Sequence, residues 1–415
     1  MKNRTKTPRM NSLDLSDIKV IDQHCHMYLN QSSIDVRALV TSASMKAFNP
    51  NFLYPERTVE QYFKSSGLDE TTRSEIQELF AAGKSSMQYK EFVREIAKYL
   101  NCSEDADSIV KARNDQASDF RSYTSRLFKD ARIETLIFAD EIYQDPSHCP
   151  VKAKTKLAVH PLFYSVLDSS KDLNEAIRQF ESELENLVKK EGRIGMKSYI
   201  AYGGPRKGTG LDIGNPDSQT VSREFQMYKE KQGKVEVMSI KNLQDYFTRI
   251  AVERSIHLRV PFEFHTGIGG VDILTQKCNP LLLGPLLQDE NLRHARIILL
   301  HGGYPFVAEA GWMAHFFQNV YLDGSIILST NAIAAVRRVE EALEWVPYSK
   351  FLYSSDGGGL PEKYWVTAKV AKRTMSTVLV KMIEAGIVGE KEAREIAEGF
   401  FHKNSERLYG SLLSN

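Results

Sequence analysis

The 415-residue sequence has few cysteines, no long hydrophobic run and no excess of charge of either sign. Its four cysteines are scattered and form no CxxC pair, which argues against a disulfide framework and fits a reducing compartment. No stretch is long and apolar enough to cross a bilayer. The net charge of +1 gives no electrostatic reason to expect nucleic acid or an acidic membrane as a partner. These absences predict a soluble, cytoplasmic protein.

The N-terminus is basic but does not have the composition of a signal peptide. Several basic residues occur within the first nine positions, but no apolar segment follows them as in a signal peptide. We therefore predict that residues 1–17 form a disordered leader. The sequence contains neither internal repeats nor low-complexity segments.

What the sequence does contain is an alternation of short β-rich runs and amphipathic helical patterns, which is typical of a parallel α/β architecture. Eight such runs are present, at residues 18–23, 132–139, 156–163, 193–201, 260–266, 295–301, 320–323 and 351–356. Eight alternating units favour a closed (β/α)₈ TIM-like barrel over an open sheet. We expect this barrel to occupy residues 18–415.

The interval between the first two runs is too long for a single crossover helix. Residues 27–131 are charged and helical in pattern, with amphipathic stretches at 70–82, 89–100 and 108–119. A loop after the first strand emerges at the C-terminal face of a barrel, where active sites form. We interpret residues 27–131 as a helical insertion that acts as a lid or supplies substrate-specifying groups, or that only stabilises the fold.

His24-Cys25-His26 closes the first β-rich run. Alternate residues of a strand point to the same face, so His24 and His26 are predicted to project together, with Cys25 facing away. Two imidazoles on one face make half of a metal site.

Four later strands carry residues that could complete the site. In a barrel the C-terminal ends of all strands meet at one mouth, so residues far apart in sequence become neighbours. These candidates are Lys197, His265, His301 and Asp356. Imidazole and carboxylate together suit Zn²⁺, and also Fe, Mn or Ni. Each residue alone also fits a core histidine, a turn or a helix cap, so the metal interpretation depends on their occurrence together.

The order of these motifs resembles the amidohydrolase superfamily of metal-dependent hydrolases, and most closely its amidohydrolase-related (type 2) group. It is also similar to the amidohydrolase part of fungal and plant proteins in which such a barrel is fused to a glutamine-synthetase-like domain. The resemblance extends from about Ile18 to Gly410. It rests on the stretches IDQHCH, GMKSYIAY, FEFHTGIGG, LLHGGYPF, VYLDGS, SSDGGGLPEKYWVTAK and FFHKNSERLYG.

The resemblance implies a role for each candidate. His24, His26 and His265 would be metal ligands, and Asp356 would be both a ligand and a proton acceptor. His301 would bind a second metal or polarise the substrate. Lys197 occupies a position where some superfamily members carry a carbamylated lysine. A carbamate would bridge two metal ions, whereas a free amine would leave one metal and could bind a substrate carboxylate.

Further residues lie near the expected mouth. Glu263 shares a face with His265 and could orient a ligand, or it could belong to a polar layer lower in the barrel. His160 in the third run, and Tyr304 after the sixth, are candidates for substrate contact. Arg206, in the loop after the fourth run, could grip a substrate carboxylate or simply be solvated.

The expected activity is hydrolysis of a C–N (amide) bond in a small molecule by metal-activated water, with one or two divalent ions, preferably zinc. The fused relatives suggest a γ-glutamyl-like amide by analogy only. A metal-dependent decarboxylase or other lyase on the same barrel is the alternative, and a non-catalytic binding protein is a third reading. The partner would be a small-molecule substrate. The outer helices leave a homo-oligomer open.

Overall fold

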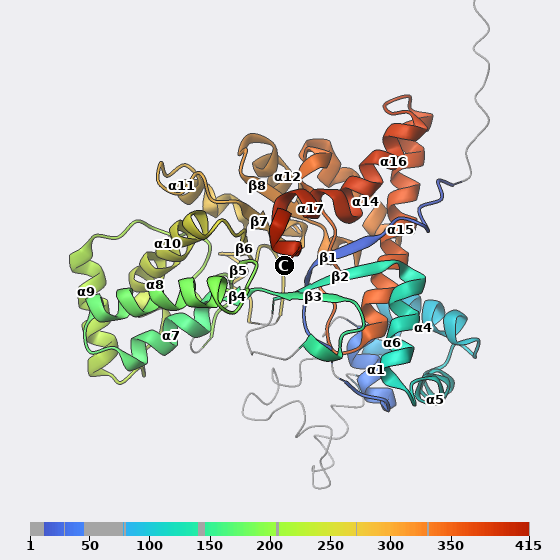
Figure 1. Cartoon of the computed structure of the whole chain (residues 1–415), viewed down its shortest axis with the longest axis horizontal. Helices are drawn as coiled ribbons and strands as arrows, with labels where there is room; N and C mark the ends of the chain where they lie inside the picture. The colour runs from blue at the N-terminus through green and yellow to red at the C-terminus, as the bar shows by residue number, and fades with distance from the viewer. Residues whose placement is uncertain are drawn as a thin grey trace, which may run out of the picture.

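The computed structural model describes residues 12–28, 30–44, 78, 80–139, 146–204, 207–270, 272–329 and 332–414. Its strands are all parallel and lie in two ladders (Figure 1). The first contains β1 (Val20–Cys25), β2 (Ile133–Phe138) and β3 (Lys152–Thr155). The second runs in chain order through β4 (Leu157–Ala158), β5 (Met196–Ser198), β6 (Phe262–Phe264), β7 (Ile297–Leu299), β8 (Val320–Asp323) and β9 (Phe351–Leu352).

Backbone hydrogen bonds join the two ladders at both ends. β3 and β4 are separated only by Lys156, whose N–H donates to the Phe138 carbonyl, so they act as one strand that changes partner. On the other side, the segment after β9 meets β1, where the Asp356 N–H donates to the His24 carbonyl at 3.1 Å. Eight strand positions therefore close into a barrel, and the predicted fold class is confirmed.

The third strand differs from the prediction. It ends at Ala158, and helix α7 (Val159–Ser169) begins immediately after it. Pro161 fits the first helical turn, because the N–H that proline lacks has no helical partner there. His160 therefore lies in a helix, and the prediction that it belongs to strand three is wrong. The apolar run 156–163 concealed this boundary because its hydrophobicity continues through it.

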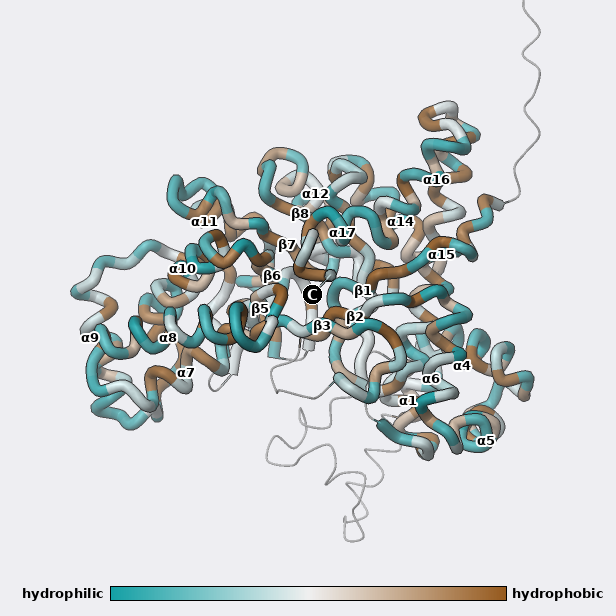
Figure 2. The backbone as a smooth tube through the Cα atoms, viewed as in Figure 1, coloured by the Kyte–Doolittle hydropathy of each residue, from teal (hydrophilic) through white to brown (hydrophobic). Residues whose placement is uncertain are grey.

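The connections between later strands are mostly helical. Apolar and polar residues alternate along these helices, as the colours of the tube in Figure 2 show, and most of the apolar residues are buried. Asp172 and Asp217 cap the starts of two of these helices by accepting hydrogen bonds from the backbone N–H three residues on. The main helices are α8 (Leu173–Lys189), α9 (Ser218–Glu230), α10 (Lys241–Leu258), α11 (Gly284–Leu287), α12 (Val307–Phe316), α13 (Ser325–Leu328), α14 (Ala332–Trp345), α15 (Pro361–Glu384), α16 (Glu390–Glu398) and α17 (Asn404–Tyr409).

The predicted insertion is helical where it is described. It contains α1 (Val36–Ala43), α4 (Met87–Leu100) and α5 (Ala106–Gln116), and α6 (Phe120–Ala131) takes the crossover position against β2 and α15. Most of the expected helix at 70–82 lies outside the described residues. Figure 1 shows these helices gathered on one side of the barrel, beside α15. A lid function for them remains a prediction.

The N-terminal segment differs from the predicted leader. Residues 1–11 lie outside the described residues, but residues 12–17 pack against α15. Leu15 is buried, and the Leu13 backbone exchanges two hydrogen bonds with the Ser376 hydroxyl. Lys372 donates to the carbonyls of Ser16 and Ile18. The packed chain therefore begins before Ile18, because α15 offers partners that no local pattern reveals.

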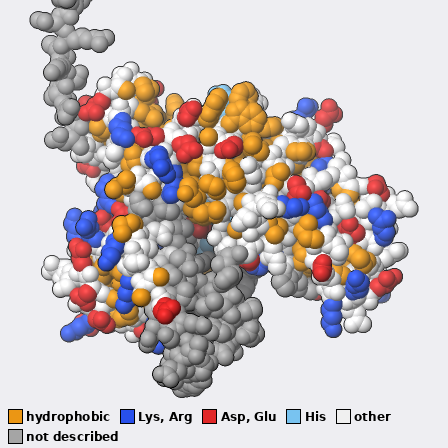
Figure 3. All heavy atoms as spheres, turned by 180° about the vertical axis from the view of Figure 1, so that it is seen from behind, with side chains coloured by type: hydrophobic (Ala, Val, Ile, Leu, Met, Phe, Trp, Pro, Cys, Tyr) orange, Lys and Arg blue, Asp and Glu red, His pale blue; other side chains and the backbone are white. Residues whose placement is uncertain are grey.

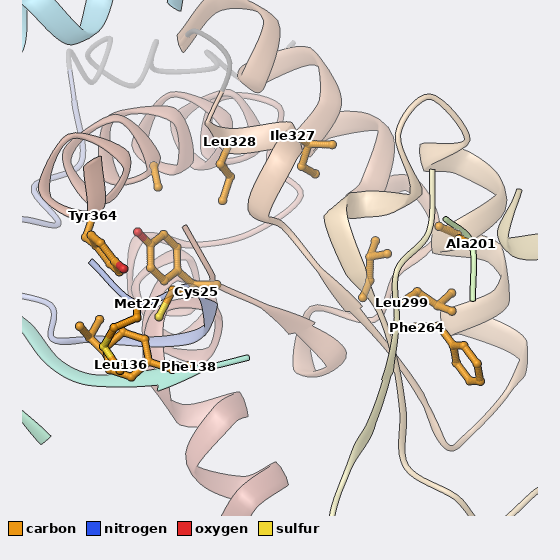
Figure 4. Packing of buried hydrophobic residues seen from close by; sticks show 14 of the residues in the cluster. Cys25, Met27, Leu136, Phe138, Ala201, Phe264, Leu299, Ile327, Leu328 and Tyr364 are labelled. Atoms are coloured by element: carbon orange, nitrogen blue, oxygen red, sulfur yellow. The ribbon is translucent and has the colours of Figure 1, made fainter. Parts of the chain in front are cut away.

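Two hydrophobic clusters surround and close the barrel. The large outer core lies between the strands and their helices, and Figure 4 shows Cys25 within it, beside Met27, Leu136 and Phe138. The smaller cluster closes the N-terminal end of the barrel. There the C-terminal residues Leu408, Tyr409 and Leu413 pack on Ile21, Ile137, Ile194, Ile298 and Leu352.

Two further observations concern the surface and the helices. Positive and negative side chains are interspersed on the face that Figure 3 shows. Among the described helices, none combines the length and the apolar character needed to cross a membrane.

Candidate metal centre

The structure brings the six residues of the predicted constellation to the C-terminal ends of the strands. His24 is in β1 and His26 follows it, while Lys197 is in β5. His265 follows β6, His301 lies in the short turn η5 (Leu300–Gly303) after β7, and Asp356 comes four residues after β9.

Distances show that the constellation is a single cluster. One ligand atom each from His24, His301 and Asp356 lies within 4.8 Å of the other two. Asp356 Oδ1 is 3.4 Å from His26 Nε2 and 3.7 Å from His24 Nε2. His265 Nδ1 is 2.8 Å from His301 Nε2. Residues more than 300 positions apart in sequence thus belong to one cluster.

Two members of the cluster have an unusual backbone. Asp356 has φ 48° and His301 has φ 67°, the left-handed region that costs a non-glycine residue about 1–2 kcal/mol. The surroundings hold both residues there. The His301 N–H donates to Asp323 at 2.9 Å, and the segment around Asp356 is bonded to β1. Strained residues of this kind concentrate at functional sites.

Glu263, together with Lys156, holds His24 in its orientation. Its Nδ1 lies 2.9 Å from Glu263 Oε2, and the other Glu263 oxygen accepts a hydrogen bond from Lys156. All three side chains are completely buried. A carboxylate only accepts hydrogen bonds, so the imidazole proton is on Nδ1 and the Nε2 lone pair faces the cluster. The predicted orienting role of Glu263 therefore has a specific contact behind it.

Burial determines the charge of the histidines. It lowers the pKa values of His24, His265 and His301 well below the usual range, with further lowering from neighbouring positive groups. Burial alone would raise the pKa of Asp356, but the nearby imidazoles hold it well below its usual value. Neutral imidazoles and an ionised carboxylate are the protonation states that a metal cation requires. The donor set thus fits a divalent ion.

Lys197 lies inside the same cluster. Its Nζ is 3.0 Å from His24 Nε2 and 4.6 Å from the centre of the Tyr199 ring. The side chain is buried. The lysine nitrogen is therefore close to the Nε2 lone pair of His24, which the hydrogen bond between His24 Nδ1 and Glu263 directs into the site.

Two other predicted residues lie outside the donor set of the cluster. His160 is buried in α7, where its Nδ1 accepts a hydrogen bond from the Tyr199 N–H at 3.2 Å. Tyr304 is half-buried, with the Arg338 guanidinium 4.1 Å above its ring. The Tyr304 backbone N–H donates to the His301 carbonyl at 3.2 Å, so Tyr304 borders the cluster through its main chain. Arg206 lies outside the described residues.

Sequence reasoning considered Asp323 only as a candidate for substrate contact and, apart from Glu263, assigned no residue the role of holding the cluster in place. Asp323 accepts hydrogen bonds from Gln23, Ser325 and Ser354, as well as from the His301 backbone. Ser355 donates to Asp22 in the same manner. The two serines before Asp356 thus tie the last strand to its two neighbours. The sequence signal for these contacts was the Ser-Ser-Asp motif together with the aspartates of the two neighbouring strands.

Comparison with known proteins agrees with this architecture. Residues 237–411 match the protein family described as "Amidohydrolase". The curated protein fluG of Emericella nidulans is 28% identical over 242 residues, which are 56% of this chain and 27% of fluG. The chain therefore spans about a quarter of the length of that relative.

Solved structures share the fold over nearly the whole chain. A candidate metal-dependent hydrolase from Lactobacillus casei ATCC 334 superposes with a TM-score of 0.76 at 21% identity, covering 96% of this chain and 98% of the other. A uronate isomerase from Thermotoga maritima gives 0.67 at 13% identity, with 95% of both chains covered. At these identities the likeness concerns the fold alone.

Proposed function

We propose, given that this chain is related to the amidohydrolases, that it is a metal-dependent hydrolase of a C–N bond in a small amide. The observation that carries this proposal is the convergence of His24, His301 and Asp356 at the barrel mouth. His26 and His265 contact the same group and are further proposed ligands. Zinc is the metal we propose, because imidazole and carboxylate are ligands that it favours in open catalytic sites.

The number of metal ions depends on Lys197. We propose that this lysine is carbamylated, because a carbamate would place anionic oxygens where the amine now contacts His24 Nε2, and two metals could then be bridged. Reconstitution of the metal-free protein should then require bicarbonate, and the mass should include one CO₂ per chain. A bicarbonate-independent site with one metal would show instead that Lys197 acts as an amine.

A bound divalent ion would supply Lewis-acid polarisation of the carbonyl and would acidify a water molecule. Asp356, whose pKa the nearby imidazoles lower, would accept a proton from water and return it to the leaving nitrogen. His301, as a proposed ligand, would help to hold the ion that stabilises negative charge on the carbonyl oxygen. Amide and water would thus become a carboxylic acid and an amine.

The barrel supports many reactions, since uronate isomerases share it, and fold alone does not select one. We therefore expect the activity to appear in a screen of small amides that includes γ-glutamyl amides. Product analysis separates the alternatives, because a decarboxylase would release CO₂ whereas a hydrolase releases an amine.

The first test concerns the metal. We expect the purified protein to contain divalent metal, and His24→Ala to lose most of it. His315→Ala is the control, because His315 is an exposed histidine on α12. A protein that is free of metal and indifferent to strong chelators would overturn the proposal.

The second test concerns the proton acceptor. Asp356→Asn should retain much of the metal, because four imidazoles remain, but lose about 100- to 10,000-fold in turnover. Metal content is measured alongside the rate of amine release. A near-normal rate in this variant would remove Asp356 from its proposed role.

A further inference from the structure

Ser325 makes a buried contact with His301 that the metal proposal does not use. Its hydroxyl oxygen is 2.7 Å from His301 Nδ1 and donates to Asp323 Oδ1 at 2.6 Å. Ser325 and Asp323 are completely buried, and His301 is nearly so. The three side chains form a chain of hydrogen bonds that ends at the metal cluster.

Hydrogen-bond accounting determines where the protons are. Asp323 receives five hydrogen bonds, from two backbone N–H groups and from the side chains of Gln23, Ser325 and Ser354, so it acts as an acceptor only. The single hydroxyl proton of Ser325 is therefore used on Asp323. The remaining lone pair of Ser325 must accept the Nδ1–H of His301.

The proton on Nδ1 of His301 determines the state of Nε2, the other nitrogen of the same ring. A neutral imidazole carries one N–H, so a proton on Nδ1 leaves the Nε2 of His301 as a lone pair. This Nε2 faces His265 Nδ1, while His265 Nε2 lies 3.2 Å from the Ile268 carbonyl and is placed to donate to it. Two imidazole lone pairs then face the same space, an arrangement that a positive ion stabilises.

We propose that Ser325 is a positioning residue that locks His301 in the Nδ1–H tautomer and so turns its Nε2 lone pair toward the cation. This inference rests on the proposed metal centre. Without the Ser325 hydroxyl, His301 would be free to carry its proton on Nε2 and donate it to His265 Nδ1. That tautomer satisfies the His265 contact but removes a ligand atom from the cluster.

Metal affinity provides one test, with a closely matched control. Ser255 is equally buried, but its hydroxyl donates to the Val252 carbonyl within α10. Zinc binding to the metal-free protein is measured by competition with a chromophoric chelator. We expect Ser325→Ala to lose about 10- to 100-fold in affinity, as for other groups that orient metal ligands. Ser255→Ala and Ser325→Thr, which keeps the hydroxyl, should stay near wild type.

The tautomer itself provides a second test that needs neither metal nor activity. In ¹⁵N-histidine-labelled metal-free protein, nitrogen shifts distinguish the two tautomers, and His301→Gln identifies the signal of His301. We expect Nδ1–H in the wild type and a shift toward Nε2–H in Ser325→Ala. Nε2–H in the wild type, or equal zinc affinity of Ser325→Ala and wild type, would overturn the inference. Absence of zinc binding in the wild type would instead refute the proposed function, and the tautomer would still decide the role of Ser325.

Discussion

At the scale of single residues, the surroundings decide what each side chain does. The same combination of lysine, glutamate and histidine occurs twice in the part of the chain that the structure describes. Lys156, Glu263 and His24 are completely buried, whereas Lys19 and Glu406 are 36% and 39% exposed and Glu406 contacts the mostly buried His402. Only the buried trio holds its groups rigidly, because water does not compete for their hydrogen bonds.

This pair of trios allows a controlled prediction. Glu263→Gln keeps the shape of the side chain but removes the negative charge that orients His24 and balances Lys156. We expect zinc affinity to fall by about 10- to 100-fold. Glu406→Gln is the matched control and should leave zinc affinity unchanged. Equal affinity in both variants would contradict an orienting role for Glu263.

His160 gives a residue-scale prediction about pH. Burial lowers its pKa from 6.5 to about 4, so the folded chain keeps it neutral where the unfolded chain takes up a proton. The stabilisation is therefore fully present above pH 6.5 and is lost as the pH falls toward 4. The contribution of this group to the free energy of unfolding should decrease by about 3 kcal/mol over that range.

The measurement is urea unfolding at several pH values. His160→Asn can still accept the Tyr199 N–H but does not titrate, so its stability should fall less steeply between pH 6.5 and 4 than that of the wild type. Parallel stability curves for the two proteins would show that His160 does not contribute to acid unfolding.

At the scale of elements, the helical insertion is attached to the barrel through α15. Arg113 of α5 donates to Glu362 at the start of α15 at 2.8 Å, and Tyr123 of α6 donates to the same oxygen at 2.9 Å. Arg113 and Glu362 are each only 1% exposed. A second contact is exposed, where Arg373 of α15 pairs with Glu91 and Glu95 of α4.

These two contacts should differ strongly in energy. Arg113→Met leaves the Glu362 carboxylate buried without its cation, and we expect a loss of about 3–5 kcal/mol in the free energy of unfolding. Arg373→Met is the control, and the loss of an exposed pair should cost about 1 kcal/mol or less. Denaturant unfolding followed by circular dichroism measures both. A small effect of Arg113→Met would mean that the insertion is held mainly by apolar packing.

At the scale of the whole molecule, the barrel is closed at its N-terminal end and carries the candidate metal site at the other. The C-terminal chain returns to the N-terminal end of the barrel, where Tyr409 is buried and its hydroxyl donates to Gln23 at 3.1 Å. Gln23 in turn donates to Asp323. The last turns of the chain therefore support the polar layer on which the metal cluster lies.

Truncation of this aromatic side chain should reveal its contribution. Tyr409→Ala removes a fully buried ring and should cost about 3–5 kcal/mol in stability. Tyr409→Phe removes only the hydrogen bond and should cost about 1 kcal/mol. Guanidinium unfolding compares the two variants, and equal losses would assign the effect to the hydroxyl rather than to packing.

Much of this architecture could be predicted from local patterns. The order of the strands, the barrel class and the candidates His24, His26, Lys197, His265 and Asp356 follow from short motifs at strand ends. The third strand was placed wrongly because a continuous apolar run hides the transition to α7. Residues 12–17 were also misjudged, because their partners lie on α15, more than 350 positions away.

The sequence by itself determined which side chains are available to bind a metal and which strands carry them, because strand periodicity and motif spacing are local properties. Only the tertiary structure decided how those side chains are oriented. Lys156 and Glu263 are 107 positions apart, and His24 and Glu263 are 239 apart. Such hydrogen bonds exist only after the barrel closes, because closure removes the water that would otherwise satisfy each group separately.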